Sequence, residues 1–418
     1  MLLQPWSEVL LLECATSSLH GPLIMSGYTP AERRAVAALA GIFSLRMLGL
    51  FMILPVFAIY GTGLAEATPQ RIGLAVGAYG LAQLLLQIPF GLLADRMDRR
   101  LLVIAGLLLF VAGGLVAAGA DTIWGVIAGR FLQGAGAISA VVMALATDLV
   151  RETHRTKALA TLGMSIGMAF ALAFVLGPML AARTGLSGLF AITALLGLLA
   201  IALCLALVPA GGGSRRELPE AWRLQLRRVA AQGQLARINA GIFILHLVLT
   251  ACFVVLPGEL VQEGLPASRH GLLYLPVMLL AFLTLVPAVI VAEKRQQMAR
   301  VYRVAIGLLM LALLVLADGR AGLTVLITGV ALFFFAFNLL EALLPSLVSK
   351  LSSPADKGTA MGLYSTCQFL GAFLGGVLGG WLEQLGQVMP LFLTLAGLSL
   401  LWLLLTQGMQ VPRRDTAL

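Results

Sequence analysis

The chain has 418 residues, of which 60% are hydrophobic and 11% are charged, and its mean hydropathy is +0.98. So apolar a composition excludes an ordinary soluble domain and is typical of a protein that lies in a lipid bilayer. The net charge of +9 comes from basic segments between apolar runs, so we expect no nucleic-acid partner.

The N-terminal segment 1–34 leads into the first helix. Residues 1–24 contain a short apolar patch but no preceding Lys or Arg, unlike a secretory signal. Met25 is therefore a candidate for the true start, with 1–24 as an artefactual extension. Thr29-Pro30 favours the start of a helix shortly before Ala35.

Apolar runs of about 20 residues recur along the whole chain and predict transmembrane helices. The predicted spans are 36–60, 72–93, 101–120, 123–147, 158–182, 188–208, 238–260, 271–292, 301–317, 322–348, 358–381 and 388–407. We therefore predict an all-α membrane protein with twelve transmembrane helices.

Loop charge predicts the orientation, because Lys and Arg concentrate in cytoplasmic loops. If the amino terminus lies inside, most of the 28 Lys and Arg fall in inner segments. The outer loops then hold only Arg71, Arg183, Arg269 and Arg320. We expect a multi-pass protein of a bacterial inner membrane with both termini in the cytoplasm.

Three pairs of like residues recur at one constant offset, which predicts two six-helix halves related as parallel repeats. The pairs are Pro55 and Pro257, Arg155 and Lys357, and Gly177 and Gly379. The predicted halves are 35–209 and 238–408, followed by a tail at 409–418. Residues 210–237 form a cytoplasmic linker with a flexible glycine joint, and its basic stretch 222–228 could be a helix on the inner leaflet or a solvated linker held near anionic lipid.

The four cysteines and four histidines are scattered singly along the chain. They offer neither a disulfide framework nor the spacing of metal ligands. No nucleophile elbow or phosphate-binding glycine loop accompanies them. We therefore expect no metal site, no cofactor and no enzyme activity.

The string Gly91-Leu-Leu-Ala-Asp95-Arg96-Met-Asp-Arg99-Arg100 connects the predicted second and third helices. Gly91 permits close helix approach, and Asp95 could lie against a helix amino terminus of the other half. The neighbouring Arg96, Arg99 and Arg100 could hold that carboxylate. Such a contact would be a conformational latch that favours one state.

Three ionisable residues, Arg46, Arg130 and Glu341, fall inside apolar spans, where charge is expensive and marks functional candidates. Glu341 could exchange a proton near neutral pH, because an apolar cavity disfavours its charged form. We expect Glu341 to carry the proton, with Arg130, Arg46 and His246 taking part in proton coupling. The alternative is a permanent structural ion pair between Glu341 and one of the two arginines.

Further polar residues predict the lining of a cavity between the spans. Arg130, Gln133, Gly134 and Ala137 are spaced to share one face of the fourth helix, where Arg130 could also merely snorkel or cap a carbonyl. The expected substrate-facing residues are Tyr79, Gln83, Gln87, Gln133, Asn239, Asn338, Tyr364 and Gln368. His246, Gln83 and Gln87 could instead form hydrogen bonds between helices. The Phe-rich run 333–337 would suit binding of an amphipathic substrate. Aromatic side chains that face the lipid bilayer would explain the run equally well.

These strings resemble motifs of the major facilitator superfamily. The Gly91 to Arg100 string is similar to its loop motif, in which Asp95 is the latch carboxylate, although Asp98 stands where glycine is usual. Arg130 to Ala137 resembles the fourth-helix motif of proton-coupled members. Gly177-Pro178 resembles the core of the antiporter motif, where small residues and a proline kink shape helix packing. The resemblance implies the two-half fold and a small-molecule substrate.

The function that we expect is secondary active export of a small organic or drug-like compound in exchange for protons, by alternating access. Two alternatives stay open: a proton-coupled uptake symporter for a metabolite, and a non-transporting membrane sensor or interaction protein. Some similar members carry a small cytoplasmic domain after the twelfth helix, whereas this sequence ends soon after Arg413-Arg414. The resemblance therefore carries over no regulatory role of that domain.

Overall fold

The computed structural model describes residues 27–94, 96–209, 222–318, 322–353 and 356–409. The predicted start at Met25, the latch residue Asp95 and the glycine joint of the linker lie outside the described residues. The helices are α2 (Pro30–Phe51), α3 (Leu54–Tyr60), η2 (Gly61–Gly63), α4 (Pro69–Ala94), α5 (Arg99–Ala118), α6 (Ile123–Ala135), α7 (Ser139–Asp148), η3 (Glu152–His154), α8 (Arg155–Leu207), α9 (Trp222–Ala230), α10 (Gly233–Gln262), η4 (Ala267–Arg269), α11 (His270–Lys294), α12 (Met298–Ala317), α13 (Leu323–Leu351), α14 (Lys357–Gln384) and α15 (Val388–Leu405).

Within the described residues, 11 helical stretches are long and apolar enough to cross a membrane. One of them, Glu152–Leu207, has 56 residues, which is more than twice the length that a bilayer needs. Gly185 divides it, because its φ of 67° and ψ of −171° interrupt α8 in a backbone region that is almost restricted to glycine. The predicted fold of twelve transmembrane helices is therefore confirmed.

The first helix begins at a reciprocal cap. The Thr29 hydroxyl accepts a hydrogen bond from the Glu32 amide at 3.2 Å, and the Glu32 carboxylate accepts one from the Thr29 amide at 2.8 Å. This arrangement satisfies amide groups that the first helical turn leaves unpaired. Pro30 occupies the first turn, so the predicted start before Ala35 is confirmed.

The prediction that Arg130 and Ala137 share one face of a continuous fourth helix is wrong. Helix α6 ends at Ala135, residues 136–138 are not helical, and α7 begins at Ser139. Helix α5 passes so close that a Cβ on Gly136 would lie 2.1 Å from the carbonyl oxygen of Gly106. The helix is interrupted where the two backbones meet. The spacing of residues along the fourth helix does not predict this interruption.

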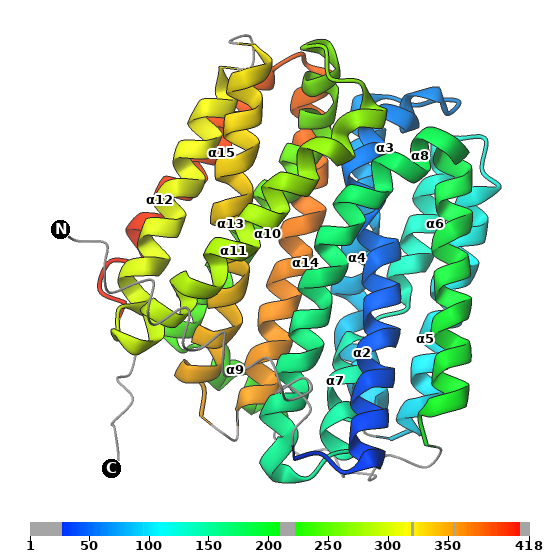
Figure 1. Ribbon diagram of the computed structural model, residues 1–418, viewed down its shortest axis with the longest axis vertical. Coiled ribbons are helices and arrows are strands. Elements are labelled where there is room, and N and C mark those ends of the chain that lie inside the picture. The colour runs from blue at the N-terminus through cyan, green and yellow to red at the C-terminus, as the bar shows by residue number, and fades with distance from the viewer. Residues whose placement is uncertain (1–26, 95, 210–221, 319–321, 354–355, 410–418) are drawn as a thin grey trace, which may run out of the picture.

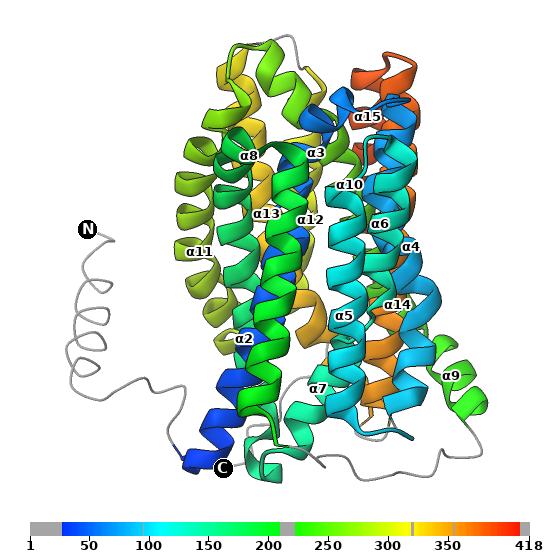
Figure 2. The same ribbon diagram turned by 90° about the vertical axis from the view of Figure 1, so that its right-hand side faces the viewer.

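The spans form two halves, with α2 to α8 in the N-terminal half and α10 to α15 in the C-terminal half (Figures 1 and 2). Helix α2 packs along α8 in the first, as α10 packs along α14 in the second. Of the predicted repeat positions, Arg155 begins α8 and Lys357 begins α14. Gly177 lies against the backbone between α2 and α3, and Gly379 lies against that of α10. The halves therefore repeat one helix pairing.

The halves come into closest contact at a glycine seam between α4 and α14, formed by Gly73, Gly77, Gly376 and Gly380. A Cβ added to Gly73 would lie 2.1 Å from the carbonyl oxygen of Gly376 and 2.8 Å from the Cα atom of Gly380. A Cβ on Gly77 would lie 2.7 Å from the carbonyl oxygen of Phe373. Small residues let helix backbones touch in this way, so the seam closes one end of the bundle.

The other end is open between the halves. We call it the basic end, and it consists of the loops that follow α4, α7, α11 and α13. A Cβ on any of four glycines near this end would meet no atom within 4 Å: Gly91 in α4, Gly163 in α8, and Gly358 and Gly362 in α14. Helices α4 and α14 therefore touch at the seam and separate toward the basic end.

We expect Gly73→Ala to weaken the seam, because its methyl group would collide with backbone atoms of α14. Overpacking of this kind destabilises a protein by about 1–3 kcal/mol, so the melting temperature of the purified protein should fall. Gly362→Ala is the matched control, since its methyl group enters open space. An unchanged melting temperature in Gly73→Ala would contradict the backbone contact.

Candidate functional site

Arg46 of α2 is fully buried and is surrounded by hydrogen-bond acceptors. Its Nη2 donates to the Tyr79 hydroxyl and to the Gly136 carbonyl oxygen, both at 2.8 Å. Its Nη1 donates to Ser139 Oγ at 3.2 Å. Gly136 lies in the break between α6 and α7. The non-helical segment therefore supplies a carbonyl acceptor for this buried guanidinium, which residue spacing did not predict.

Arg130 of α6 contacts the same tyrosine. Its guanidinium carbon lies 5.1 Å from the centre of the Tyr79 ring, within the range of a cation–π interaction. Its Nη1 donates to Gln133 Oε1 at 3.2 Å, and Gln133 donates in turn to Thr193 Oγ1 at 3.0 Å. In the described residues, Arg130 thus contacts side chains inside the N-terminal half rather than capping a carbonyl.

Neither buried arginine is neutralised in this state. Among the described residues, no ion pair joins Arg46 or Arg130 to a carboxylate. The Nε atoms of both are buried without a hydrogen bond in the same set. The permanent ion pair with Glu341 that we weighed is therefore absent from this state. Because an unpaired buried charge is costly, these arginines favour any arrangement that brings a negative charge near them.

Glu341 lies in α13 of the C-terminal half. Its side chain is half-buried, and its Oε2 has no hydrogen-bond partner among the described residues. The nearby Tyr364 of α14 interacts with it electrostatically, and the Tyr364 hydroxyl is likewise without a hydrogen bond in the described part. The adjacent Ala342 is exposed. The structure thus places a carboxyl group in this part of α13 with a buried oxygen that lacks a hydrogen bond among the described residues.

An aromatic cluster joins the two halves. It consists of Phe170 and Phe174 of α8, Phe253 of α10, Tyr274 of α11, and Phe333, Phe334 and Phe337 of α13, all of which are buried. Phe174 makes edge contacts with Phe253 at 4.9 Å and with Phe334 at 5.2 Å between ring centres. Phe170 stacks on Phe337 at 5.5 Å. Such ring contacts stabilise beyond the burial of their area.

The aromatic cluster also locates Glu341. Phe337 faces Phe170 of the other half, and Glu341 follows Phe337 by four residues, which puts it on the same face of α13 one turn further along. Helix α13 runs from the closed end to the basic end, so Glu341 lies on the open side of the cluster. The carboxyl group therefore faces the N-terminal half where the halves begin to separate.

Sequence reasoning left the role of the Phe-rich run undecided. The structure buries Phe333, Phe334 and Phe337 in the contact between halves, and only Phe335 is half-buried. Phe170 and Phe174 are four residues apart and so share a face of α8. That spacing predicts an aromatic face on α8, but it does not predict which helix packs against this face.

Several predicted lining residues tie helices together. Gln368 of α14 and His246 of α10 approach to 2.8 Å between their Nε2 atoms, so this histidine joins two helices. Gln83 of α4 donates to the Gly134 carbonyl oxygen of α6 at 2.9 Å. A Cβ on Gly134 would lie 2.4 Å from the Tyr79 carbonyl oxygen, so glycine is needed for this approach.

The remaining predicted residues differ in their contacts. Asn338 donates to the Phe334 carbonyl oxygen of its own helix at 2.9 Å. Gln87 and Asn239 are buried, and Gln87 Oε1 has no hydrogen bond among the described residues. The structure thus brings Arg46, Arg130, Tyr79, Gln83 and Gln133 into one polar network of the N-terminal half.

The arginines predicted for the latch have partners within their own half. Arg99 pairs with Asp148 at the end of α7 and donates to the Ala94 carbonyl oxygen at 3.0 Å. Arg100 donates to the Leu205 carbonyl oxygen near the end of α8 at 2.7 Å. Arg96 is exposed and Gly91 faces open space, while the latch carboxylate Asp95 lies outside the described residues.

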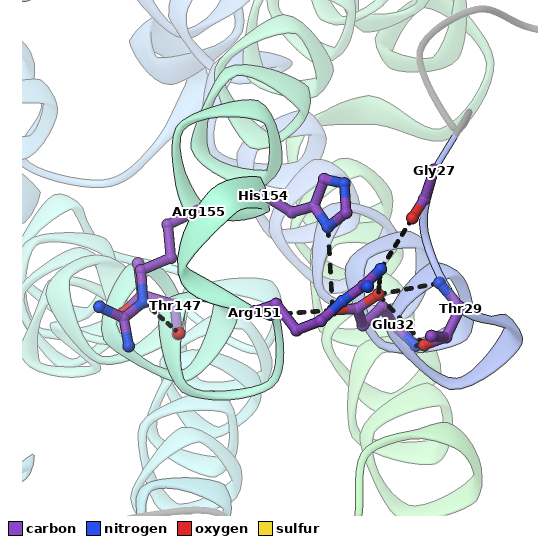
Figure 3. Close-up of polar contacts among 7 residues, drawn as sticks. All are labelled: Gly27, Thr29, Glu32, Thr147, Arg151, His154 and Arg155. Atoms are coloured by element: carbon purple, nitrogen blue, oxygen red, sulfur yellow. Dashed lines mark hydrogen bonds and ion pairs between the residues drawn. The ribbon is translucent and has the colours of Figure 1, made fainter.

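A polar cluster joins the start of α2 to the segment before α8 (Figure 3). The Glu32 carboxylate accepts hydrogen bonds from the Arg151 amide at 2.8 Å and from its Nε at 2.9 Å. Arg151 also donates to the Gly27 carbonyl oxygen at 2.8 Å, and His154 Nδ1 lies 4.0 Å from Glu32. The hydrogen bond with Glu32 raises the pKa of Arg151. The first and fifth spans are thereby joined at the basic end.

The linker helix α9 is held to the C-terminal half by Asp356, which directly precedes α14. Arg228 and Gln225 donate to its Oδ1, the latter at 3.1 Å, and Ser353 donates to its Oδ2 at 2.8 Å. These hydrogen bonds lower the pKa of Asp356, and the hydrogen bond from Arg228 has the largest effect. The helix before α10 is thus joined to the start of α14, with the charges reversed relative to Glu32 and Arg151.

The chain is similar to known membrane proteins. It matches the Major Facilitator Superfamily over residues 39–375. It is 47% identical over 387 residues to the inner membrane transport protein YajR of Escherichia coli (strain K12), an alignment that covers 92% of this chain and 85% of YajR. It is 34% identical over 386 residues to an uncharacterized transporter of Buchnera aphidicola subsp. Baizongia pistaciae (strain Bp), covering 89% of this chain and 95% of that one.

Solved structures share the fold. A bacterial homolog to the human lysosomal transporter Spinster, in an inward-facing and unoccupied conformation, superposes with a TM-score of 0.73. The match covers 94% of this chain and 100% of that chain at 15% identity. So low an identity indicates a common fold and nothing finer.

We expect Phe174→Ala to loosen the closed end, because it removes the ring that three helices of the other half contact. Truncation of a buried phenylalanine costs about 3–5 kcal/mol. Spin labels are placed on the exposed residues Thr62 and Gln387, which lie in different halves at the closed end. The distribution of distances between the two labels should shift toward longer distances. Phe131→Ala, at an exposed ring on α6, is the control, and equal distributions in both variants would disprove the closing role.

The α9 contact should persist in mild acid. The pKa of Asp356 is lowered in the folded state, so its contribution is present above the ordinary carboxyl pKa of about 3.9 and is lost as pH falls through the lower folded value. Energy transfer between labels on Ala230 and Gln407 should therefore stay constant from neutral pH to about pH 5.

Asp356→Asn should change this transfer at every pH, because the charge-assisted hydrogen bond from Arg228 is lost. Asp121→Asn at the closed end is the control. Loss of the wild-type signal already above about pH 5 would show that another titrating group holds α9.

Proposed function

This chain belongs to the major facilitator superfamily and is a membrane transporter, and we propose that it exports a small organic or drug-like compound in exchange for protons by alternating access. We also propose that its basic end faces the cytoplasm of a bacterial inner membrane with both termini on that side, in line with the positive-inside rule. The state described above is then the one that is open to the cytoplasm.

One observation carries the proposal of proton coupling. Glu341 is a carboxyl group within a transmembrane helix, half-buried, with an Oε2 that lacks any hydrogen bond among the described residues. A carboxylate in such surroundings is poorly stabilised, and gaining a proton removes its charge. Because Glu341 lies on the open side of the aromatic cluster, we propose that protons and solutes reach it from the basic end.

A single carboxyl group supports exchange. A proton and a positively charged group of a substrate can each neutralise Glu341, but not both at once, so binding of one favours release of the other. The neighbouring aromatic cluster offers apolar ring surface for the body of such a compound. These two features favour a lipophilic organic substrate.

Arg46 and Arg130 complete the proposed coupling. When the halves close at the basic end, Glu341 moves toward the N-terminal half, where both guanidinium groups lack a carboxylate partner among the described residues. An ionised Glu341 is attracted to them and a protonated one is not. Nearly complete conversion between two states requires about 5.5 kcal/mol, which is near the roughly 3–5 kcal/mol that it costs to leave one charge of a buried pair without its partner.

The other predicted residues have supporting roles in this proposal. His246 belongs to the coupling group through its contact with Gln368. We propose that Asp95, with the neighbouring Gly91 and arginines 96, 99 and 100, biases the resting state as a latch. Tyr79, Gln83 and Gln133 hold the two buried arginines.

We expect Glu341→Gln to abolish substrate-evoked proton movement, because glutamine cannot exchange a proton at this site. Internal pH is followed in liposomes of purified protein while a panel of lipophilic cations and small metabolites is added. Glu152→Gln, at a carboxylate whose side chain is 89% exposed, is the matched control. Full proton flux in Glu341→Gln would refute coupling through this residue.

The direction of transport separates export from the symport alternative. In vesicles of known orientation with an inward proton gradient, an antiporter drives the substrate outward and a symporter accumulates it inside. Accumulation inside would replace the export proposal by uptake while leaving the role of Glu341 intact. Absence of movement with every compound would favour a sensor or interaction protein.

A further inference from the structure

The linker helix α9 has one side that is already occupied. Arg228 and Gln225 reach Asp356, and Val229 is 0% exposed. These residues attach α9 to the start of α14 and to α10. The helix is therefore a fixed part of the C-terminal half, and its orientation is defined.

The exposed side of α9 combines an apolar and a cationic side chain. Leu224 is 69% exposed, among the most exposed large apolar side chains in the described residues. Arg227 is exposed as well, and three residues of spacing put it beside Leu224 on the helix surface. A leucine so exposed on a helix that does not cross the bilayer is unfavourable in water.

The position of α9 points to the membrane surface. Figure 2 shows α9 beyond the outline of the bundle, at the level of the last turn of α4 and the first turn of α14 near the basic end. Spans end at this level, so it corresponds to the headgroup region of the leaflet. An arginine there can extend its aliphatic stem along apolar groups while its guanidinium reaches phosphate.

We propose that α9 binds anionic phospholipid in the leaflet at the basic end, with Leu224 inserted among acyl chains and Arg227 on a lipid phosphate. The charge of the linker complements this partner, since residues 215–237 hold six arginines and two glutamates. Short amphipathic helices bind membranes through such a combination of apolar burial and attraction to anionic lipids. The proposal is independent of Glu341 and of the direction of transport.

The test measures the depth of residue 224 in full-length protein. In a background without Cys14, Cys204, Cys252 and Cys367, Leu224→Cys carries a nitroxide label in nanodiscs of phosphatidylglycerol or of phosphatidylcholine. Collision with oxygen reports the membrane, and collision with a water-soluble nickel chelate reports solvent. We expect the oxygen-to-nickel ratio to be several-fold higher in phosphatidylglycerol, and Arg227→Gln to remove most of that difference.

Each other outcome overturns the proposal. A label that the nickel chelate reaches in both lipids means that α9 lies in water. Equal immersion in both lipids means that Arg227 makes no contact specific to an anionic headgroup. Protection from both reagents means that protein covers Leu224. A label on Glu152→Cys, in an exposed segment at the basic end, gives the reference for solvent.

A second measurement avoids the cysteine-free background. The melting temperature of otherwise unmodified protein in mild detergent should rise when phosphatidylglycerol is added, because a ligand of the folded state stabilises it. In Arg227→Gln this rise should be smaller, while Arg33→Gln at the start of α2 keeps it. An equal rise in all three proteins would overturn the assignment to α9.

Discussion

The contact between α4 and α14 is the constraint on which the other features of the bundle depend. Glycines on both helices allow backbone atoms from different halves to meet, at distances that a single methyl group would prevent. The aromatic cluster continues this closure toward the middle of the bundle. Both contacts lie on the same side of Glu341, toward the closed end.

Unequal charge on the two halves is the second organising feature. The N-terminal half contains two buried guanidinium groups that contact tyrosine, glutamine, serine and a carbonyl oxygen. The C-terminal half contributes a carboxyl group that lacks a partner for its Oε2 among the described residues. Their separation leaves both sets of charges incompletely satisfied, and closure at the basic end would change that balance by bringing them together.

Two polar clusters join helices within each half. Glu32 and Arg151 join the first and fifth spans of the N-terminal half, and Arg228 and Asp356 join the linker helix to the fifth span of the other. Each cluster lies at the basic end, where the halves are apart and packing between them gives no support. The acidic and basic partners exchange places between the two halves, so both halves have an ion pair at this position although its charges are reversed.

The sequence by itself determined the spans, their number, the repeat and the unusual status of Arg46, Arg130 and Glu341, because hydrophobicity and charge placement are local properties that a bilayer constrains strongly. It also favoured a helix start at Thr29-Pro30 and offered a helix as one of two interpretations of residues 222–228. Only the tertiary structure decided that the fourth span breaks at residues 136–138, that phenylalanines of α8 meet those of α13, and that both arginines lack a carboxylate among the described residues. These features depend on which helix faces which, and spacing along one helix contains no information about the backbone that packs against it.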